Sequence, residues 1–309
     1  MEIKKAVILA AGLGTRMLPA TKSVPKELYP IVDKPALQHH IEELVKSGIK
    51  DILIVISRGK TLIEDHFDNA PELEERLLKG GKTAAYNEVK RISDMANIMY
   101  VRQKDITGTG DAVRMARNFT GDEPFVVMYG DDVIINDEYP VTKQLMDVYE
   151  KYGKGIAGVQ EVSREMIRQY STMKVEHLEK NLYELTDMIE KPKDEEIISL
   201  FTILGRIILP AKIYDILDKT PLSHGELQLT DAMKTLAQTD GMIAVDFDGK
   251  RYDMGNKLSV MQAQVERAVA HPEIGEDFKA YLKEYVKTLQ DNFSEDYIPS
   301  WIKAIKKEF

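Results

Sequence analysis

Residues 5–16 read KAVILAAGLGTR, an apolar run that passes without interruption into a glycine-rich turn. A continuous apolar run containing Val and Ile is typical of a parallel strand that is covered on both faces. Glycines placed directly after such a strand let backbone N–H groups approach an anion closely. The stretch therefore predicts the first strand of a doubly wound α/β sheet, followed by a phosphate-binding loop.

Apolar runs of the same kind recur along the first half of the chain. They predict strands at residues 51–57, 98–103, 125–129 and 155–162. Residues 35–48 have apolar side chains at helical spacing and end in a plausible glycine cap, and residues 61–95 predict two or three surface helices. Strands that alternate with helices indicate βαβ units. The predicted fold is therefore a Rossmann-like, doubly wound α/β sheet.

The second half of the chain has shorter strands and more helices. Strands are predicted near residues 173–175, 203–209 and 242–246, as a layer added to the same body, because no linker-like segment separates the halves. Residues 1–290 are thus predicted to form a single domain with halves at about 1–150 and 151–257. The C-terminal residues 258–309 are predicted as helices at 258–269, 278–289 and 299–309. The apolar stripe of the last helix (Trp301, Ile302, Ile305 and Phe309) is open to two interpretations, packing onto the body or contact with a second copy.

Composition excludes several classes of protein. The formal net charge is -9, which argues against non-specific binding to nucleic acid. There is no cysteine, so disulfides, thiolate catalysis and cysteine-ligated zinc are excluded. The first apolar run stops at Gly12, too early for a secretory signal, and no stretch approaches the ~20 apolar residues of a membrane span. We therefore expect a cytoplasmic protein that partners neither nucleic acid nor membrane.

Three kinds of nucleotide-binding loop compete for the glycine-rich turn. The Walker pattern Gly-x-x-x-x-Gly-Lys-Ser/Thr is absent. A dinucleotide loop would have a third glycine where this chain has Met17, and an acid near the end of the second strand, which here ends at Ser57 and Arg58. The third kind places a cation after the glycines, and this chain has Arg16 there. Lys22 and Lys26 come next, in a loop interrupted by prolines, so the cations are able to surround a triphosphate.

At residues 10–34 the sequence, AAGLGTRMLPATKSVPKELYPIVDK, closely resembles that of bacterial UTP–glucose-1-phosphate uridylyltransferases of the sugar nucleotidyltransferase superfamily. Further family motifs occur in the same order: VRQ at 101–103, GDD at 130–132, EKP at 190–192, ELQLTDA at 226–232 and DMGNKL at 253–258. The resemblance implies a fold of the nucleotide-diphospho-sugar transferase type, with a nucleotide half, an added sugar-binding layer and C-terminal helices. It also implies a homo-oligomer, either a dimer or a tetramer.

The reaction implied by this resemblance is transfer of a uridylyl group from UTP to glucose 1-phosphate, which yields UDP-glucose and pyrophosphate. The sugar phosphate oxygen attacks the α-phosphorus in line, with Mg²⁺ as the expected cofactor. Carried over residue by residue, the resemblance implies four groups of site residues. They are catalytic Arg16, Lys26 and Lys191; nucleotide-binding Ala10, Ala11, Gly12, Gly14, Thr15, Lys26, Gln103, Gly108, Gly110 and Asp131; sugar-binding Ser171, Glu190, Lys191 and Gly205; and the metal ligands Asp131 and Asp253.

The residues themselves add physical reasons for two of these roles. Asp131 comes just after the predicted strand 125–129, and carboxylates at the carboxyl end of a parallel strand lie where open α/β sheets bind ligands. Mg²⁺ commonly takes one or two such oxygen ligands. Gln103 ends another predicted strand, and its amide has both a donor and an acceptor for the edge of uracil.

Three positions depart from the family pattern. The family has Gly where this chain has Ser171, Tyr where it has Ile207, and Gly where it has Ser259. Because these changes are on the sugar side, a second hypothesis keeps the chemistry but changes the sugar 1-phosphate, to galactose or an N-acetylated amino sugar. A third hypothesis is a non-catalytic homologue that binds UTP or a UDP-sugar.

Overall fold

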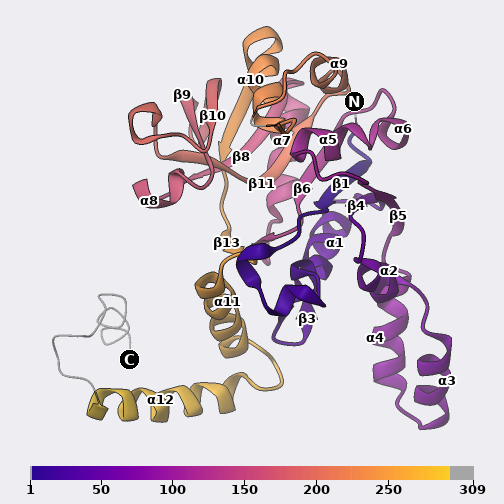
Figure 1. Ribbon diagram of the computed structural model, residues 1–309. Coiled ribbons are helices and arrows are strands. Elements are labelled where there is room, and N and C mark those ends of the chain that lie inside the picture. The colour runs from indigo at the N-terminus through magenta and orange to yellow at the C-terminus, as the bar shows by residue number, and fades with distance from the viewer. Residues whose placement is uncertain (1, 224, 293–309) are drawn as a thin grey trace.

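The computed structural model describes residues 2–223 and 225–292, built around one nine-stranded sheet (Figure 1). The strand order is β5-β4-β1-β6-β11-β8-β12-β10-β9. The first four strands in this order are mutually parallel, and they are β5 (Asn97–Arg102), β4 (Asp51–Ile56), β1 (Lys5–Ala10) and β6 (Phe125–Tyr129). The carboxyl ends of these four strands lie at one edge of the sheet, as predicted.

Helices cover both faces of the parallel strands. Val7 and Leu53 point into one core, while their neighbours Ile8 and Ile54 point into the other, as alternation along a strand requires. The first core is closed by α5 (Thr109–Arg114), α9 (Ile213–Leu217) and α10 (Leu229–Asp240). The second is closed by α1 (Ala36–Lys46), α2 (Thr61–Phe67) and α7 (Val141–Tyr152). The predicted doubly wound α/β fold is confirmed.

Shorter elements fill the connections. Residues 61–95 form three helices, α2 and then the hairpin of α3 (Pro71–Lys79) and α4 (Thr83–Ser93), which extends from the body in Figure 1. The proline-interrupted loop after β1 holds three 3₁₀ turns, η1 (Thr15–Met17), η2 (Ala20–Lys22) and η3 (Lys26–Leu28). The remaining short helices are α6 (Arg117–Thr120), α8 (Arg164–Ile167) and the 3₁₀ turn η4 (Asp194–Glu196).

The second half of the chain extends the same sheet. It supplies β11 (Phe201–Leu209), β8 (Gly155–Glu161) and β12 (Met242–Asp246), and then the antiparallel hairpin of β9 (Ser171–Glu179) and β10 (Leu182–Glu190). The strand predicted at 173–175 is therefore much longer. β10 was not predicted, because polar side chains alternate along both strands of this edge hairpin and no continuous apolar run marks them.

Two small antiparallel ladders were also missed by the sequence pattern. They join β7 (Asp132–Ile135) to β13 (Lys250–Asp253) and β2 (Pro30–Ile31) to β3 (Lys34–Pro35). Strands of two to four residues are too short to show a period, and each exists through its partner. Around them lies a third, small core to which Val133, Tyr252 and Ala263 contribute.

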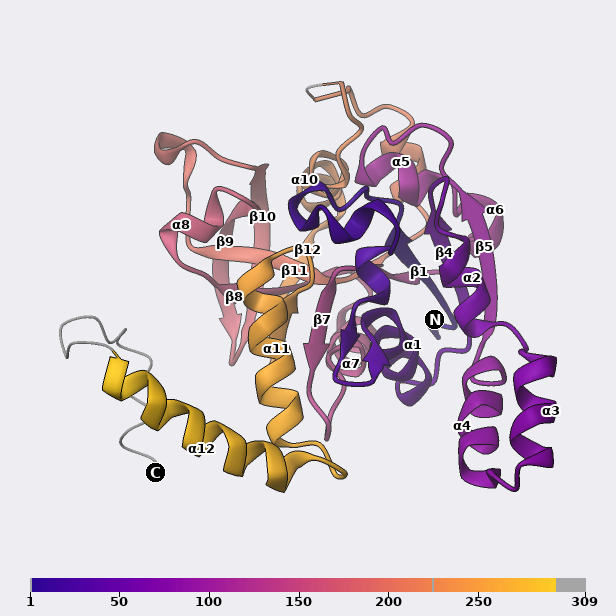
Figure 2. The ribbon, with the colours of Figure 1, turned by 60° about the horizontal axis from the view of Figure 1, so that its bottom comes forward.

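The described C-terminal residues are helical. α11 (Lys257–Val269) packs near β13, and α12 (Gly275–Asn292) continues away from the sheet (Figures 1 and 2). The helices predicted at 258–269 and 278–289 are thus confirmed, whereas the one predicted at 299–309, with its apolar stripe, lies outside the described residues. No helix among the described residues has the length and apolarity to cross a membrane.

Candidate active site

The glycine-rich loop begins where β1 ends, and its shape depends on Gly14. This residue has φ +65, a left-handed conformation that side chains disfavour, and its carbonyl accepts a hydrogen bond of 2.8 Å from the Thr21 hydroxyl. The loop then folds back on itself. As a result, Lys26 Nζ lies 3.8 Å from the position that a Cβ on Gly12 would occupy. The turn therefore places a lysine ammonium against the glycine backbone.

Lys26 forms an ion pair with Asp131, which lies just beyond the end of β6. The Lys26 side chain is only 12% exposed. Burial alone would lower the pKa of Lys26, but Asp131 and Glu27 outweigh burial and raise the pKa above its ordinary value. The same pairing lowers the pKa of Asp131, although burial opposes this. Both directions indicate a charged pair at the junction of the loop and the sheet.

The β7–β13 ladder brings Asp253, which is distant in sequence, into this centre. Asp132, the first residue of β7, is directly opposite Asp253, and the Asp131 carbonyl accepts a hydrogen bond from Met254 N–H at 2.8 Å. The Arg16 guanidinium approaches the Asp253 carboxylate to 3.7 Å. A Cβ on Gly255 would come within 2.7 Å of that guanidinium, so the glycine in this motif makes room for Arg16.

Asp131 and Asp253 fit a hard divalent cation, because both present carboxylate oxygens. Across residues 2–223 and 225–292, no group of three or more His, Asp or Glu side chains is arranged to hold an ion. A metal held at this place would therefore take two carboxylates from the chain and its remaining ligands from phosphate or water. That ligand set is typical of Mg²⁺.

Arg251 is a charged residue of this centre that the sequence pattern did not indicate. Its Nε donates to Asp132 Oδ1 at 2.8 Å, and its guanidinium lies over the Tyr170 ring at 4.6 Å. The Tyr170 hydroxyl in turn donates to Asp253 Oδ2 at 2.8 Å. Burial and the neighbouring carboxylates raise the pKa of Asp132 to about 6, and the charge of Arg251 opposes this rise. No local motif signals Arg251, since the contact depends on strand pairing.

Gln103, the predicted base reader, is 2% exposed, and its amide donates to Asp111 at 2.9 Å and to the Gly108 carbonyl at 3.3 Å. A Cβ on Gly108 would come within 2.4 Å of the Leu227 carbonyl, and one on Gly110 within 2.9 Å. The close approach that excludes side chains at these glycines is therefore made by Leu227. Contact of Gln103, Gly108 and Gly110 with a base stays a prediction.

The predicted sugar motif is connected to the same centre. Lys191 has φ +44, and its N–H donates to the Tyr170 carbonyl at 2.6 Å, which connects the end of β10 to the residue that contacts Asp253. Glu190 accepts a hydrogen bond of 2.8 Å from the Thr230 hydroxyl, and burial raises the pKa of Glu190. The backbone contact of Lys191 with Tyr170 thus links the sugar motif to the Asp253 carboxylate.

Two of the three departures from the family pattern are buried. Ser171 is 3% exposed and contacts the Thr202 hydroxyl, and Ile207 is fully buried in the first core. Ser259 accepts a hydrogen bond from Asp253 N–H at 2.8 Å, which steadies the proposed metal ligand. Gly205 has φ +62, and a Cβ there would come within 2.6 Å of Asp132. A sugar contact at Ser171 or Gly205 remains a prediction.

The family comparison agrees with this geometry. The model of the family described as nucleotidyl transferase matches residues 5–268, from β1 to α11. The chain belongs to the nucleotidyl transferase family. The matched region of this nucleotidyl transferase contains the glycine loop, Asp131 and Asp253. The glycine loop and Asp131 follow the carboxyl ends of β1 and β6, where open α/β sheets bind ligands.

Individual relatives are similar over nearly the whole chain. This nucleotidyl transferase is 45% identical to UTP–glucose-1-phosphate uridylyltransferase YngB of Bacillus subtilis (strain 168) over 287 residues, 93% of this chain and 96% of the relative. It is also 45% identical to the UTP–glucose-1-phosphate uridylyltransferase of Staphylococcus epidermidis over 92% of this chain and 98% of the relative. The predicted resemblance is confirmed.

Solved structures give the same answer for the fold. A UTP-bound UGPase from Acinetobacter baumannii has a TM-score of 0.85 at 33% identity, over 92% of this chain and 99% of that one. A UDP-glucose pyrophosphorylase complexed with UDP-glucose has a TM-score of 0.78 at 38% identity, over 86% of this chain and 98% of that one. The nucleotidyl transferase fold is therefore shared along nearly the full length of these neighbours.

Another ion pair of the nucleotidyl transferase, buried between the glycine loop and β4, was also not predicted. Lys60, near the end of β4, donates to both carboxylate oxygens of Glu27 at 2.8 Å and to the Ala10 carbonyl at 2.5 Å. The two side chains are 8% and 1% exposed. Burial raises the pKa of Glu27 and lowers that of Lys60, and the attraction between the two opposes both shifts. This buried pair ties the residue next to Lys26 to the end of β1.

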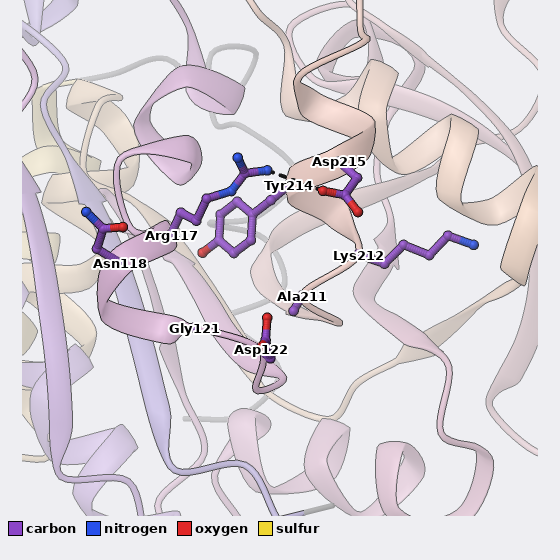
Figure 3. Close-up of a pocket in the computed structure, with 8 residues that line it drawn as sticks. All are labelled: Arg117, Asn118, Gly121, Asp122, Ala211, Lys212, Tyr214 and Asp215. Carbon is purple, nitrogen blue, oxygen red and sulfur yellow. Dashed lines mark ion pairs between the residues drawn. The ribbon is translucent and has the colours of Figure 1, made fainter.

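A cavity of about 440 Å³ lies elsewhere on the nucleotidyl transferase (Figure 3). It is bounded by Arg117, Asp122 and Tyr214, beside the amino end of β6, whereas the glycine loop and Asp131 are at the carboxyl ends of the parallel strands. Arg117 is already paired with Asp218 at 2.8 Å. The cavity is thus separate from the candidate active site.

Proposed function

We propose that this chain transfers a uridylyl group from UTP to glucose 1-phosphate, giving UDP-glucose and pyrophosphate. The observation that carries the proposal is the Lys26–Asp131 pair, held against the glycine loop with Asp253 and Arg16 beside it. The names of the 45% identical relatives favour the same substrates. Ser171 and Ile207 are both buried, so these two departures give no positive support for a different sugar.

In this mechanism the chain supplies positioning and positive charge. The sugar phosphate oxygen forms a bond to the α-phosphorus of UTP as the bond to the β-phosphate oxygen breaks, and pyrophosphate carries away the electron pair. Because the nucleophile is already an anion, no general base is needed. Lys26, Arg16 and the loop N–H groups hold the triphosphate, and Lys191 holds the sugar phosphate. Glu190 accepts hydrogen bonds from sugar hydroxyls, and Gln103 binds the uracil edge.

We propose Mg²⁺ as the cofactor, held by Asp131 and Asp253. When bound, the ion would neutralise phosphate charge and hold the reacting groups in line. In the structure the Asp131 carboxylate is paired with Lys26. A bound triphosphate would attract the lysine toward its own oxygens, which would free the Asp131 carboxylate to bind the ion. The negative charge that the ion requires would come from Asp131 and Asp253.

The test is pyrophosphate release from UTP, dTTP, CTP and ATP, each combined with glucose, galactose and N-acetylglucosamine 1-phosphates, with and without Mg²⁺. We expect Mg²⁺-dependent turnover that is fastest with UTP and glucose 1-phosphate. Turnover with UTP and another sugar would keep the chemistry and change the substrate. If UTP binds but no combination of substrates turns over, the proposal of an enzyme would be replaced by that of a nucleotide sensor.

We further propose that the chain acts in the cytoplasm as a homo-oligomer, a dimer or a tetramer. The absence of cysteine suits a reducing compartment. On the outer side of α11, Leu258, Met261 and Val265 are 66%, 58% and 37% exposed at helical spacing. An apolar stripe of this kind on a projecting helix pair favours contact with a second copy.

A further inference from the structure

Three carboxylates meet in the candidate active site, and the two consecutive ones face different partners. Asp131 pairs with Lys26 from the glycine loop. Asp132 begins β7, and its Oδ1 accepts from Arg251, while Oδ2 lies 2.9 Å from the point where a Cβ on Gly205 would be. Asp131 lies in the turn between β6 and β7, whereas Asp132 is the first residue of β7, and this difference accounts for the division.

The Asp132 side chain is enclosed by neighbouring residues of the protein. The Asp132 and Arg251 side chains are each 7% exposed. Arg206, which is itself buried, donates to the Asp132 carbonyl at 2.9 Å, and Gly205 packs against the Asp132 side chain because it has no Cβ. The Asp132 carboxylate is therefore committed to Arg251 inside the protein.

We propose that Asp132 is not a metal ligand but the counter-charge of Arg251, and that this ion pair sets the net charge at the metal site. This inference rests on the proposed function, in which Asp131 and Asp253 hold the ion. Arg251 cancels the charge of Asp132, so the ion experiences the charge of two carboxylates and not three.

The proposal predicts a rescue that a metal-ligand role for Asp132 does not. In Asp132→Asn, the guanidinium is left without its counter-charge 3.9 Å from Asp253 Oδ2, and it repels a divalent cation. In Asp132→Asn/Arg251→Met, both charges are gone, and the net charge at the site returns to that of the wild type. If Asp132 coordinated the ion, its ligand oxygen would still be missing in the double variant, and Mn²⁺ binding would stay well below that of the wild type despite the loss of the guanidinium.

The experiment is titration of Mn²⁺, followed by its electron paramagnetic resonance signal, into the full chain with saturating UTP and no sugar phosphate. We expect Asp132→Asn to weaken Mn²⁺ binding roughly tenfold, the scale of one pKa unit caused by a charge within ~4–6 Å. The double variant is expected within about twofold of the wild type. Thermal unfolding of each variant, recorded in parallel, identifies any protein that has not folded.

Two further variants separate the possible failures. Asp131→Asn should abolish Mn²⁺ binding, and if it does not, the proposed metal site itself is wrong. Arg117→Met, a matched arginine change on an ion pair beside the amino end of β6, should leave Mn²⁺ binding unchanged. A double variant that binds as weakly as Asp132→Asn, or an Asp132→Asn variant that binds like the wild type, would overturn the inference.

Discussion

At the scale of single residues, the proposed chemistry depends most on Lys26. It is one of a charged pair with Asp131, lies against Gly12, and is 12% exposed. Replacing it with Ala should lower kcat/KM roughly 10²–10³-fold, the scale found when one preorganised donor to a developing charge is removed. Steady-state pyrophosphate release measures the effect.

A matched lysine provides the control for this prediction. Lys50 is exposed just before the amino end of β4, away from the glycine loop. Lys50→Ala should change kcat/KM less than about twofold, as expected for a surface change. If Lys26→Ala lowered kcat/KM by less than about threefold, Lys26 would not be part of the proposed phosphate-binding group.

At the scale of elements, the glycine loop is held to β1 and β4 by the buried Lys60–Glu27 pair. Glu27→Gln leaves the Lys60 ammonium buried without its counter-charge. The free energy of unfolding should fall by about 3 kcal/mol, in the range for breaking a buried ion pair. Urea unfolding followed by circular dichroism measures this loss.

Two further variants test whether the loss of stability comes from the buried ion pair. Glu27→Gln/Lys60→Met removes both charges and should recover most of the lost stability, since a pair without charges avoids the desolvation cost. Glu88→Gln breaks an exposed pair with Arg91 and should cost less than about 1 kcal/mol. If the Glu27 and Glu88 variants were equally stable, the buried pair would not be anchoring the loop.

At the scale of the whole molecule, α12 extends away from the body beyond α11 (Figure 2), and α11 has exposed apolar side chains on its outer side. Met261 is 58% exposed in the middle of the α11 stripe. Met261→Glu should therefore shift the molecule from an oligomer toward the monomer mass, because a charge buried in an apolar contact is strongly unfavourable. Size-exclusion chromatography with light scattering measures the mass.

The control for oligomerisation is Leu78→Glu, which alters a similarly exposed leucine, 52% exposed, on the α3–α4 hairpin. It should leave the mass unchanged. A wild-type protein that is monomeric at all concentrations, or a mass that both variants leave unaltered, would contradict a contact through α11.

Strands were predicted correctly where the sequence has a long, apolar and buried run. They were missed where a polar segment becomes a strand only through hydrogen bonds to a neighbouring strand. β1 and β6 are found where the apolar runs predict them. β10 and β13 carry polar side chains and form because neighbouring strands complete their hydrogen bonds. The predicted single domain, with its halves at 1–150 and 151–257, remains a proposal.

Local sequence patterns alone placed candidate site residues next to strand ends. The glycine loop and Asp131 each lie next to an apolar strand, and the end of a strand fixes the position of the next few residues in the chain. The partners of the buried charges depend on tertiary packing. Arg251 meets Asp132, and Lys60 meets Glu27, because strands and turns distant in sequence pack together, and no local pattern encodes which buried charges will face each other.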